Sequence, residues 1–474
     1  MRRRNNIWRN IDWPIVIIYL ALILMGWVNI YAAVYNDEYS SMFDFSQRYG
    51  KQLVWIIAAL VIAFTVFIID IRFYSYFAYI LYGILVFVLI YVLIFGVEIN
   101  GAKAWIQIGN MSIQPAEFAK FTTALALARY LSTYNIELNK VKIYFRVLLI
   151  IFLPSVLIFL QNDTGSALVY FAFFLVLYRN GLSESVLLLG FFLLVLFFLA
   201  LLLNKLVIFL LVCSVAFVVF YFITKQLKNT ILGVLIFIAS IALLFGINEI
   251  FDLKFSNYYL LAASLVLSFL IYFYLAIAKK IKRVFLVSIF LISSILITFS
   301  VDYFFNNILE PHQQERINNL LGIEFDPLGA GYNVNQSKIA IGSGGFSGKG
   351  FLRGTQTKFD FVPEQTTDFI FCTIGEEWGF VGTSLIVILF VVFLIRLIIL
   401  AERQRTKFSR IYGYGVVSIL FTHFTVNIGM TIGLFPVIGI PLPFFSYGGS
   451  SLWAFTILLF IFLRLDASRT EHLI

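Results

Sequence analysis

The stretch IVIIYLALILMGWVNIY, residues 15–31, contains no charged side chain. As an α-helix it would cross most of the roughly 30 Å hydrocarbon core of a bilayer. Runs of this kind recur along the 474 residues, which are 61% hydrophobic and only 12% charged. A water-soluble domain of this length could not bury so much apolar surface, so lipid is the expected solvent. Because many apolar runs follow the first, that run is expected to be a retained span and not a cleaved signal peptide.

The apolar runs predict an all-α polytopic membrane protein with about fourteen transmembrane helices joined by mostly short connections. The expected spans are 14–34, 52–70, 73–95, 114–132, 143–160, 165–179, 183–204, 206–223, 230–251, 258–278, 283–305, 368–400, 412–436 and 444–465.

Basic residues predict the sidedness of these spans. The N-terminus carries four arginines, and every second connection after it is also rich in Lys and Arg, which places these segments in the cytoplasm. Both termini are therefore expected to be cytoplasmic. The net charge of +9 then mostly reflects the basic connections expected in the cytoplasm, and no basic patch is left for nucleic acid. Membrane lipid is the expected anionic neighbour of these connections.

Two regions interrupt the pattern of spans and short connections. One is the turn NGAKAWIQIGNMSIQPAEFAKF (100–121), and the other is a loop of about 60 residues, 306–367, which this topology places outside the cell. Loops of that length in a compact protein are usually functional or disordered, and the apolar and glycine residues of this one predict order. The two cysteines lie in or beside apolar runs and the three histidines are scattered, so neither a disulfide framework nor a zinc site is expected.

The glycine-rich run AIGSGGFSGKGFLRGTQ (340–356) does not fit the Walker phosphate-binding pattern, since Ser343 replaces its first glycine and Gly350 its Ser/Thr. Two readings stay open. The run is a tight turn at the membrane edge, or it is a nest of backbone N–H groups that, with Lys349 and Arg353, cradles a lipid-linked diphosphate.

Carboxylates near the membrane plane are the other candidates, because an ionisable group in a span is costly unless it is paired or hydrated. Glu117 and Lys120 share one helix face and form either a structural ion pair or a functional one. Asp163, in QNDTGSAL, is either a helix N-cap or functional. The pair Glu376/Glu377 belongs to the same group of candidates.

Asp368, in VPEQTTDFIF (362–371), lies where a polar segment enters an apolar one. As a cap it would fit the helix start, since TTD is favourable N-terminal chemistry. As a general base it would be placed at the outer mouth, beside an ordered loop and four residues after Glu364. The residues alone leave both roles open.

These motifs resemble the SEDS family (shape, elongation, division and sporulation proteins), and its elongation branch more than its division branch. The matching stretches are GAKAWIQIGNMSIQPAEFAK, QNDTGSAL, DPLGAGYNVNQSKIAIGSGGFSGKGFLRGTQTKFDFVPEQTTDFIF, GEEWGFVG and NIGMTIGLFPVIGIPLPFFSYGGSS. Their order and spacing match across nearly the whole chain.

The resemblance implies a peptidoglycan glycosyltransferase that polymerises lipid II at the outer face of the bacterial cytoplasmic membrane during cell elongation. It implies a class B penicillin-binding protein (a transpeptidase) and the elongation machinery as partners. The family's essential acid falls on Asp368, its membrane-cavity pair on Glu117 and Lys120, and its aromatic position on Trp105.

In this interpretation Asp368 takes the proton of the acceptor hydroxyl, and Lys120, Lys349 and Arg353 stabilise the leaving diphosphate. Asp163, Glu364 and Glu376 are supporting residues. A bound divalent cation, Mg²⁺ or Mn²⁺, would add to the stabilisation of the diphosphate.

The chain departs from the family in two respects. Relatives usually read QPDLGT where this chain reads QNDTGS, and they typically have ten spans. The expected organisation is therefore a core of ten spans plus about four inserted helices of unknown role. Its four parts are an N-terminal membrane core (1–205), the inserted helices (206–305), the large extracytoplasmic loop (306–367) and a C-terminal membrane core (368–474).

Two other classes of function remain open. A flippase for lipid II would also contain many helices and buried charges, but it should carry polar features on both sides, whereas the motifs here gather at the outer face. A non-catalytic scaffold for the transpeptidase would tolerate substitution of the carboxylates.

Overall fold

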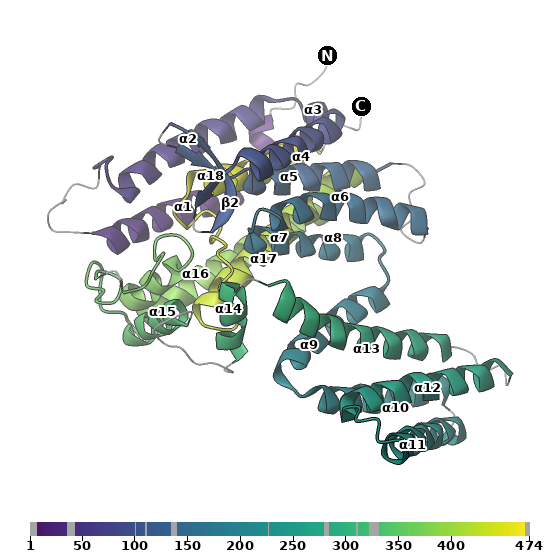
Figure 1. Ribbon diagram of the computed structural model, residues 1–474. Helices are drawn as coiled ribbons and strands as arrows, with labels where there is room; N and C mark the ends of the chain where they lie inside the picture. Colours follow the sequence, from purple (N-terminus) through teal and green to yellow (C-terminus); the bar gives the residue numbers. More distant parts are fainter. Residues whose placement is uncertain are drawn as a thin grey trace. The chain divides into compact units, whose positions relative to one another are not determined.

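The computed structural model describes residues 7–35, 43–99, 101–109, 111–133, 140–225, 227–278, 284–309, 311–321, 331–359 and 361–469. Within these residues the chain is almost entirely helical (Figure 1). It forms two compact units, one from Met1–Ser183 with Asp326–Ile474 and the other from Glu184–Phe325. The second unit begins before the inserted region expected at 206–305 and ends after it, because α9 and α14 group with it.

The first unit contains the segments at both ends of the chain. Its elements are η1 (Ile7–Asn10), α1 (Trp13–Val34), α2 (Arg48–Ile68), α3 (Ile71–Tyr76), α4 (Ala78–Phe95), β1 (Val97–Ile99), β2 (Ala102–Ile108), β3 (Met111–Ile113), α5 (Pro115–Leu131), α6 (Val141–Phe159), α7 (Thr164–Leu168), η2 (Val169–Ala172), α8 (Phe173–Arg179), α15 (Tyr332–Ser343), α16 (Ile370–Glu402), α17 (Lys407–Thr431) and α18 (Gly449–Ala467).

Three helices, α5, α17 and α18, form the centre of this unit. Each packs against the other two, and α2, α4 and α16 pack around them. Small residues allow the close approach; the Cα of Gly415 on α17, for example, faces Ala124 on α5. Because α5 and α18 are buried along nearly their whole length, polar side chains on them face protein and not lipid.

A small antiparallel sheet replaces the turn expected at 100–121. Strand β2 pairs with β1, with Val97 opposite Trp105, and with β3, with Ile106 opposite Ile113. Gly101 and Gly109 occupy the two turns in the left-handed backbone region that glycine tolerates. The all-α expectation missed this sheet because its strands are three to seven residues long and give only a weak alternating pattern.

Two of the expected spans are interrupted helices. The span expected at 165–179 consists of α7, η2 and α8 in succession. Helix α16 changes direction at Gly379, which has φ 61° and ψ −156°. The other expected spans each overlap a helix, but the last two begin at Lys407 and Gly449 and not near 412 and 444.

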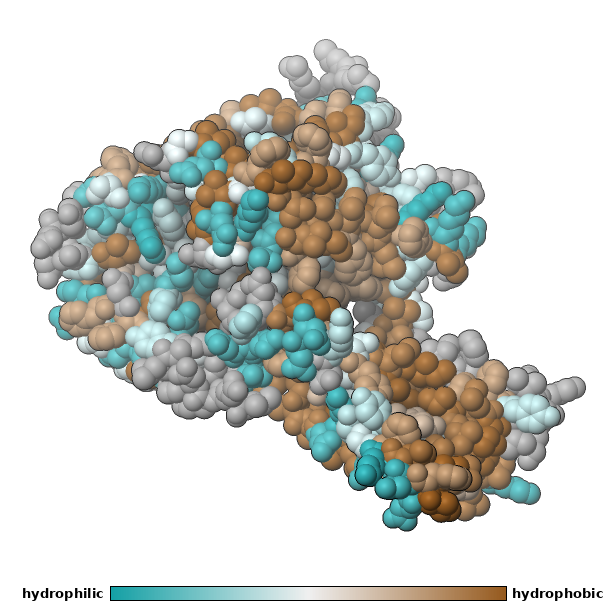
Figure 2. All heavy atoms as spheres, in the orientation of Figure 1, coloured by the Kyte–Doolittle hydropathy of each residue, from teal (hydrophilic) through white to brown (hydrophobic). Residues whose placement is uncertain are grey.

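Nine helices within the described residues are long and apolar enough to cross a membrane on their own. Thr164–Arg179, Leu188–Leu202 and Asn257–Ile271 are shorter apolar segments. The count of fourteen spans therefore stays a prediction. Hydrophobic residues cover much of the face shown in Figure 2. Exposed apolar side chains such as Phe64, Phe87 and Phe222 are expected for helices that contact lipid.

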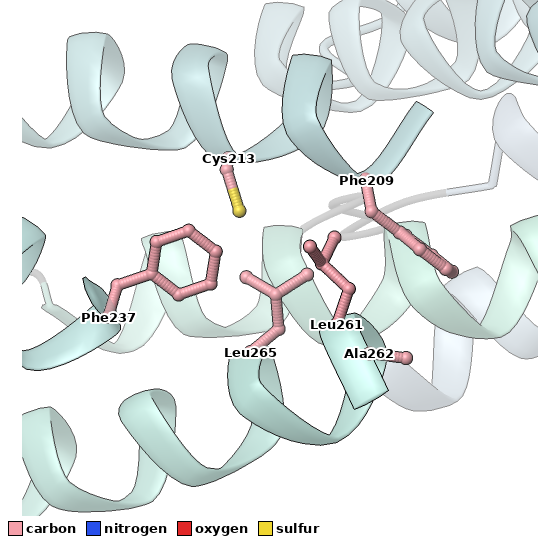
Figure 3. Packing of buried hydrophobic residues seen from close by; sticks show 6 residues of the cluster. All are labelled: Phe209, Cys213, Phe237, Leu261, Ala262 and Leu265. Atoms are coloured by element: carbon pink, nitrogen blue, oxygen red, sulfur yellow. The ribbon is translucent and has the colours of Figure 1, made fainter. Parts of the chain in front are cut away.

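The second unit is a helical bundle with its own apolar core. It contains α9 (Glu184–Leu202), α10 (Lys205–Thr224), α11 (Leu227–Ile250), α12 (Asn257–Ala278), α13 (Val284–Asn307) and α14 (Pro311–Leu321). Six buried side chains from α10, α11 and α12 converge on one another (Figure 3), namely Phe209, Cys213, Phe237, Leu261, Ala262 and Leu265. A second cluster joins Leu196 of α9 to Ile208 and Val212 of α10.

The long loop expected at 306–367 is partly helical. Helices α14 and α15 lie within it, and α15 packs against α16 and α17. The segment 322–330 lies outside the described residues.

Candidate active site

Asp368 lies at the entry to α16. The N-cap position of this helix is Phe369, so Asp368 precedes the cap by one residue. Its side chain is half-buried. A Cβ atom added at Gly439 would lie 3.4 Å from Asp368 Oδ2, which places this carboxyl group beside the turn between α17 and α18. The position does not match that of a capping residue, and it leaves the carboxyl group partly accessible.

The main chain around Asp368 is held by α17 and by the turn that follows it. Asn427 Nδ2 donates to the main-chain oxygen of Asp368 at 2.9 Å and to that of Ile440 at 2.7 Å. The hydroxyl of Ser446 donates to Thr367 O at 2.6 Å. The segment 366–368 and the turn 439–447 therefore form one hydrogen-bonded unit.

An arginine from α2 reaches the same place. Arg48 Nη1 donates to Thr366 Oγ1 at 2.7 Å, and Arg48 is otherwise exposed. The main-chain N–H of Tyr447 donates to Thr366 O at 2.8 Å. Burial raises the pKa of the Tyr447 phenol, so this hydroxyl stays neutral. An exposed cation from α2 thus contacts Thr366, which precedes Asp368 by two residues.

Glu364 shapes the segment that precedes Asp368. Its backbone has φ 51°, and its main-chain oxygen accepts hydrogen bonds from the N–H groups of Thr367 and Phe369. Its carboxylate accepts a bond of 3.0 Å from the hydroxyl of Thr367. The side chain is exposed and supports the turn from outside.

Glu117 and Lys120 are paired on α5, as expected, and a third residue joins them. Lys120 Nζ lies 2.7 Å from Glu117 Oε1 and 2.9 Å from Nε2 of His423 on α17. His423 Nδ1 lies 3.1 Å from the main-chain oxygen of Pro441. Since a carbonyl only accepts, Nδ1 carries the proton and Nε2 accepts from the ammonium. The ring of Phe455 completes the environment, 5.0 Å from Lys120 Nζ.

Asp163 lies between the N-terminal ends of α7 and α5, and Trp105 lies on a strand that precedes α5. Asp163 caps α7, since its Oδ1 accepts from the N–H of Ser166 at 3.0 Å. Its Oδ2 accepts from Gln114 Nε2 at 2.7 Å, just before α5 begins. Trp105 is half-buried on β2. Asp163 thus has the capping role and in addition ties α7 to the start of α5.

Glu376 organises the glycine-rich segment. It is fully buried, and its carboxylate accepts from Lys349 Nζ at 2.7 Å and from the main-chain N–H groups of residues 355, 356 and 357. The hydroxyls of Thr355 and Thr357 also donate to it. The backbone nest expected here thus encloses a carboxylate of the protein itself, and Lys349 is its counter-ion.

Close backbone packing fixes the rest of this segment. The N–H groups of Lys349 and Gly350 donate to the main-chain oxygens of Glu376 and Glu377 at 3.0 and 2.9 Å. Gly348, with φ 79°, lies so close to the main chain of Glu377 that a side chain there would collide with it. Glu377 Oε1 accepts from the N–H of Leu352 at 3.1 Å, and Arg353 is exposed. The segment is a tight turn docked on α16.

No three His, Cys, Asp or Glu side chains within the described residues lie close enough together to hold a metal ion. Two buried carboxylate oxygens, Glu117 Oε2 and Glu377 Oε2, accept no hydrogen bond there.

The structure thus joins Asp368, Glu117 and Lys120 through α17 and the turn after it, and it places Lys349 and Glu376 in a separate network. Sequence reasoning missed Arg48, His423 and Asn427. A polar or ionisable side chain inside an apolar run is a signal in itself, and His423 and Asn427 both lie in the expected span 412–436.

The sequence matches a known family over most of its length. The model of the FtsW/RodA/SpoVE family, described as a cell cycle protein, matches residues 12–229 and 211–471. The peptidoglycan glycosyltransferase RodA of Treponema pallidum is 32% identical over 455 residues, which cover 93% of this chain and 94% of that protein. The peptidoglycan glycosyltransferase MrdB of Escherichia coli is 30% identical over 444 residues, which cover 94% and 90%.

Solved structures show the same fold. One chain, from work on the structural coordination of polymerization and crosslinking by a peptidoglycan synthase complex, aligns with a TM-score of 0.63 and 26% identity, covering 97% of this chain and 99% of its own length. The crystal structure of the rod shape determining protein RodA of Thermus thermophilus aligns with a TM-score of 0.57 and 24% identity, covering 97% and 98%.

Proposed function

Because this chain belongs to the FtsW/RodA/SpoVE family and is a peptidoglycan glycosyltransferase of cell elongation, we propose that it polymerises lipid II into glycan strands at the outer face of the cytoplasmic membrane. One observation supports Asp368 as the centre of this activity. It is a half-buried carboxyl group whose main chain is fixed by Asn427 and by the turn after α17. Such a group is held in place and still accessible to a substrate.

In the proposed reaction, Asp368 accepts the proton of the acceptor sugar hydroxyl as that hydroxyl attacks the anomeric carbon of the donor. The bond to the lipid diphosphate breaks, and the configuration at that carbon inverts. A positioned general base of this kind contributes about 10²–10⁴-fold to a rate.

The leaving diphosphate requires positive charge. Arg48 offers an exposed guanidinium that is anchored at Thr366, and guanidinium groups pair well with phosphate oxygens. Lys120 adds a buried ammonium behind the junction, held by Glu117 and His423. Lys349 is already paired with Glu376, so Arg48 is the better candidate for the diphosphate.

A divalent cation is part of the proposal. Mg²⁺ is often held by one or two carboxylates together with phosphate oxygens of the substrate, so a full set of protein ligands is not needed. The unpartnered Glu117 Oε2 is a suitable oxygen. The cation would neutralise charge on the diphosphate as it leaves.

We also propose a class B penicillin-binding protein as the partner, alongside the elongation machinery. The support is the likeness to a chain of a complex that coordinates polymerization and crosslinking. Both termini are proposed to be cytoplasmic and residues 306–367 extracytoplasmic, on the basis of the alternating basic connections. A cysteine introduced at Arg353 tests this: it should react with a membrane-impermeant reagent in intact cells, and an unreactive cysteine there would contradict the topology.

The decisive experiment incubates the purified protein, with and without its transpeptidase, with labelled lipid II. The expected product is glycan polymer that is absent with Asp368→Asn. Transport of lipid II across vesicles without polymer formation would instead indicate a flippase. Normal cell growth with Asp368→Asn would indicate a scaffold.

A further inference from the structure

Two side chains on one face of α17 form hydrogen bonds with the carbonyl groups of two consecutive residues in the turn that follows this helix. His423 and Asn427 are four residues apart, so they lie one above the other on the helix. His423 Nδ1 contacts Pro441 O at 3.1 Å, and Asn427 Nδ2 donates to Ile440 O at 2.7 Å. Both side chains are completely buried. The turn is thus clamped to α17 at two adjacent residues.

Each of these side chains also reaches a different part of the candidate site. His423 accepts from Lys120 through Nε2, and Asn427 donates to the main-chain oxygen of Asp368. One chain of hydrogen bonds therefore runs from Glu117 through Lys120 and His423 to the turn, and from the turn through Asn427 to Asp368.

The amide of Asn427 has only one workable orientation. Its nitrogen faces two carbonyl oxygens, while its Oδ1 is buried and accepts no hydrogen bond from the described residues. A flipped amide would place Oδ1 against both carbonyls. An unsatisfied buried acceptor is costly, and such groups persist where another requirement fixes them. Here that requirement is the double donation to Asp368 and Ile440.

We propose that His423 and Asn427 are positioning residues of the glycosyltransferase, which together set the place of Asp368 relative to the Glu117–Lys120 pair. This inference rests on the proposed role of Asp368. Neither residue touches the reacting atoms. His423 acts through Lys120 and the turn 439–441, and Asn427 acts through the main chain of Asp368 and the same turn. Loss of either releases the turn from one of its two attachments.

The test compares steady-state kinetics of polymerisation by the full-length protein with its transpeptidase partner. His423→Phe keeps an aromatic ring against Phe455 but removes both polar atoms, and Asn427→Leu keeps the volume but cannot donate. We expect kcat to fall about 10–100-fold in each, because misplacement by about an ångström has such an effect, while KM for lipid II changes little.

Three further variants separate positioning from simple loss of structure. The double variant should lose less than the product of the two single losses, since both side chains hold one turn. His423→Gln, which can still accept from Lys120, should recover part of the activity lost in His423→Phe. Thr431→Val is the matched control on α17, because among the described residues the Thr431 hydroxyl bonds only to its own helix, and it should stay near wild type.

The outcomes are distinct from those of the proposed function. Absence of glycan from the wild-type protein overturns the function itself. With an active wild type, the inference is overturned by a raised KM at unchanged kcat, by losses that multiply in the double variant, or by an equal loss in Thr431→Val. If Asn427→Leu is not monodisperse, Asn427→Asp replaces it. The aspartate side chain has the same shape as asparagine but cannot donate to both carbonyl groups. Full activity of Asn427→Asp overturns the inference.

Discussion

Asp368 lies just before α16 and Glu376 lies near its N-terminal end, and the protein surrounds the two carboxyl groups in opposite ways. Glu376 is fully buried, and both its oxygens accept hydrogen bonds from the glycine-rich segment. Asp368 is half-buried and is fixed through its main-chain oxygen. A fully buried carboxylate that accepts bonds from a loop holds that loop in place, whereas a partly exposed carboxyl group at a fixed junction can reach a substrate.

The largest expected effect is that of Asp368→Asn. Asparagine has nearly the same size and shape as aspartate, so the fold should be intact, but it cannot accept the proton of the acceptor hydroxyl. Polymerisation should fall about 10²–10⁴-fold, with normal membrane insertion and transpeptidase binding. The measurement is glycan formed from labelled lipid II. Near-normal activity would assign Asp368 a structural role and erase its contrast with Glu376.

Substitution of Glu376 should act on stability. Glu376→Leu leaves the N–H groups of 355–357 and the ammonium of Lys349 without their acceptor. Removal of one partner from such a buried network costs about 3–5 kcal/mol. The thermal midpoint in detergent should drop clearly, while the kcat of the molecules that remain folded stays close to normal. A loss of kcat at an unchanged midpoint would give Glu376 a chemical role after all.

Lys349→Met should have a smaller effect of the same kind. Its side chain is 26% exposed, so loss of the ion pair with Glu376 should cost only about 1 kcal/mol. KM for lipid II should not change if the ammonium is committed to Glu376. A large rise in KM without a shift of the midpoint would support the diphosphate role considered from sequence.

The smallest effect is expected for Arg353→Ala. Arg353 is exposed, and surface substitutions of this kind usually change stability by less than about 0.5 kcal/mol. Arg48→Ala is the informative companion, since Arg48 lies at Thr366, beside Asp368. We expect KM for lipid II to rise with Arg48→Ala and not with Arg353→Ala. The reverse result would place the diphosphate at the glycine-rich segment.

Most of the helices could be predicted from the sequence because apolar runs have a clear length requirement in a membrane. The strands 97–113 could not, because they are short and only partly alternate. The break between α7 and α8 was also missed: Gly165 packs directly against the main-chain oxygen of Ile438, a contact between residues far apart in sequence.

Prediction of the candidate site was limited in the same way. Motifs identified Asp368, Glu117 and Lys120, because each of these residues lies in a short continuous stretch of sequence. The role of His423 depends on Pro441 and Lys120, and that of Glu376 on the N–H groups of residues 355–357; these partners come together only in the folded chain. Residue types therefore indicated the candidates, and tertiary contacts showed that one of them, Glu376, anchors a loop.

The cluster of Phe209, Cys213, Phe237 and their neighbours has a consequence for how the chain can change over evolution. Because α10, α11 and α12 bury their apolar side chains on one another, they have an apolar core of their own. Insertions and deletions are tolerated best where they leave an existing core intact. Under the expected topology, the gain or loss of two of these spans at a time would preserve the sidedness of everything downstream.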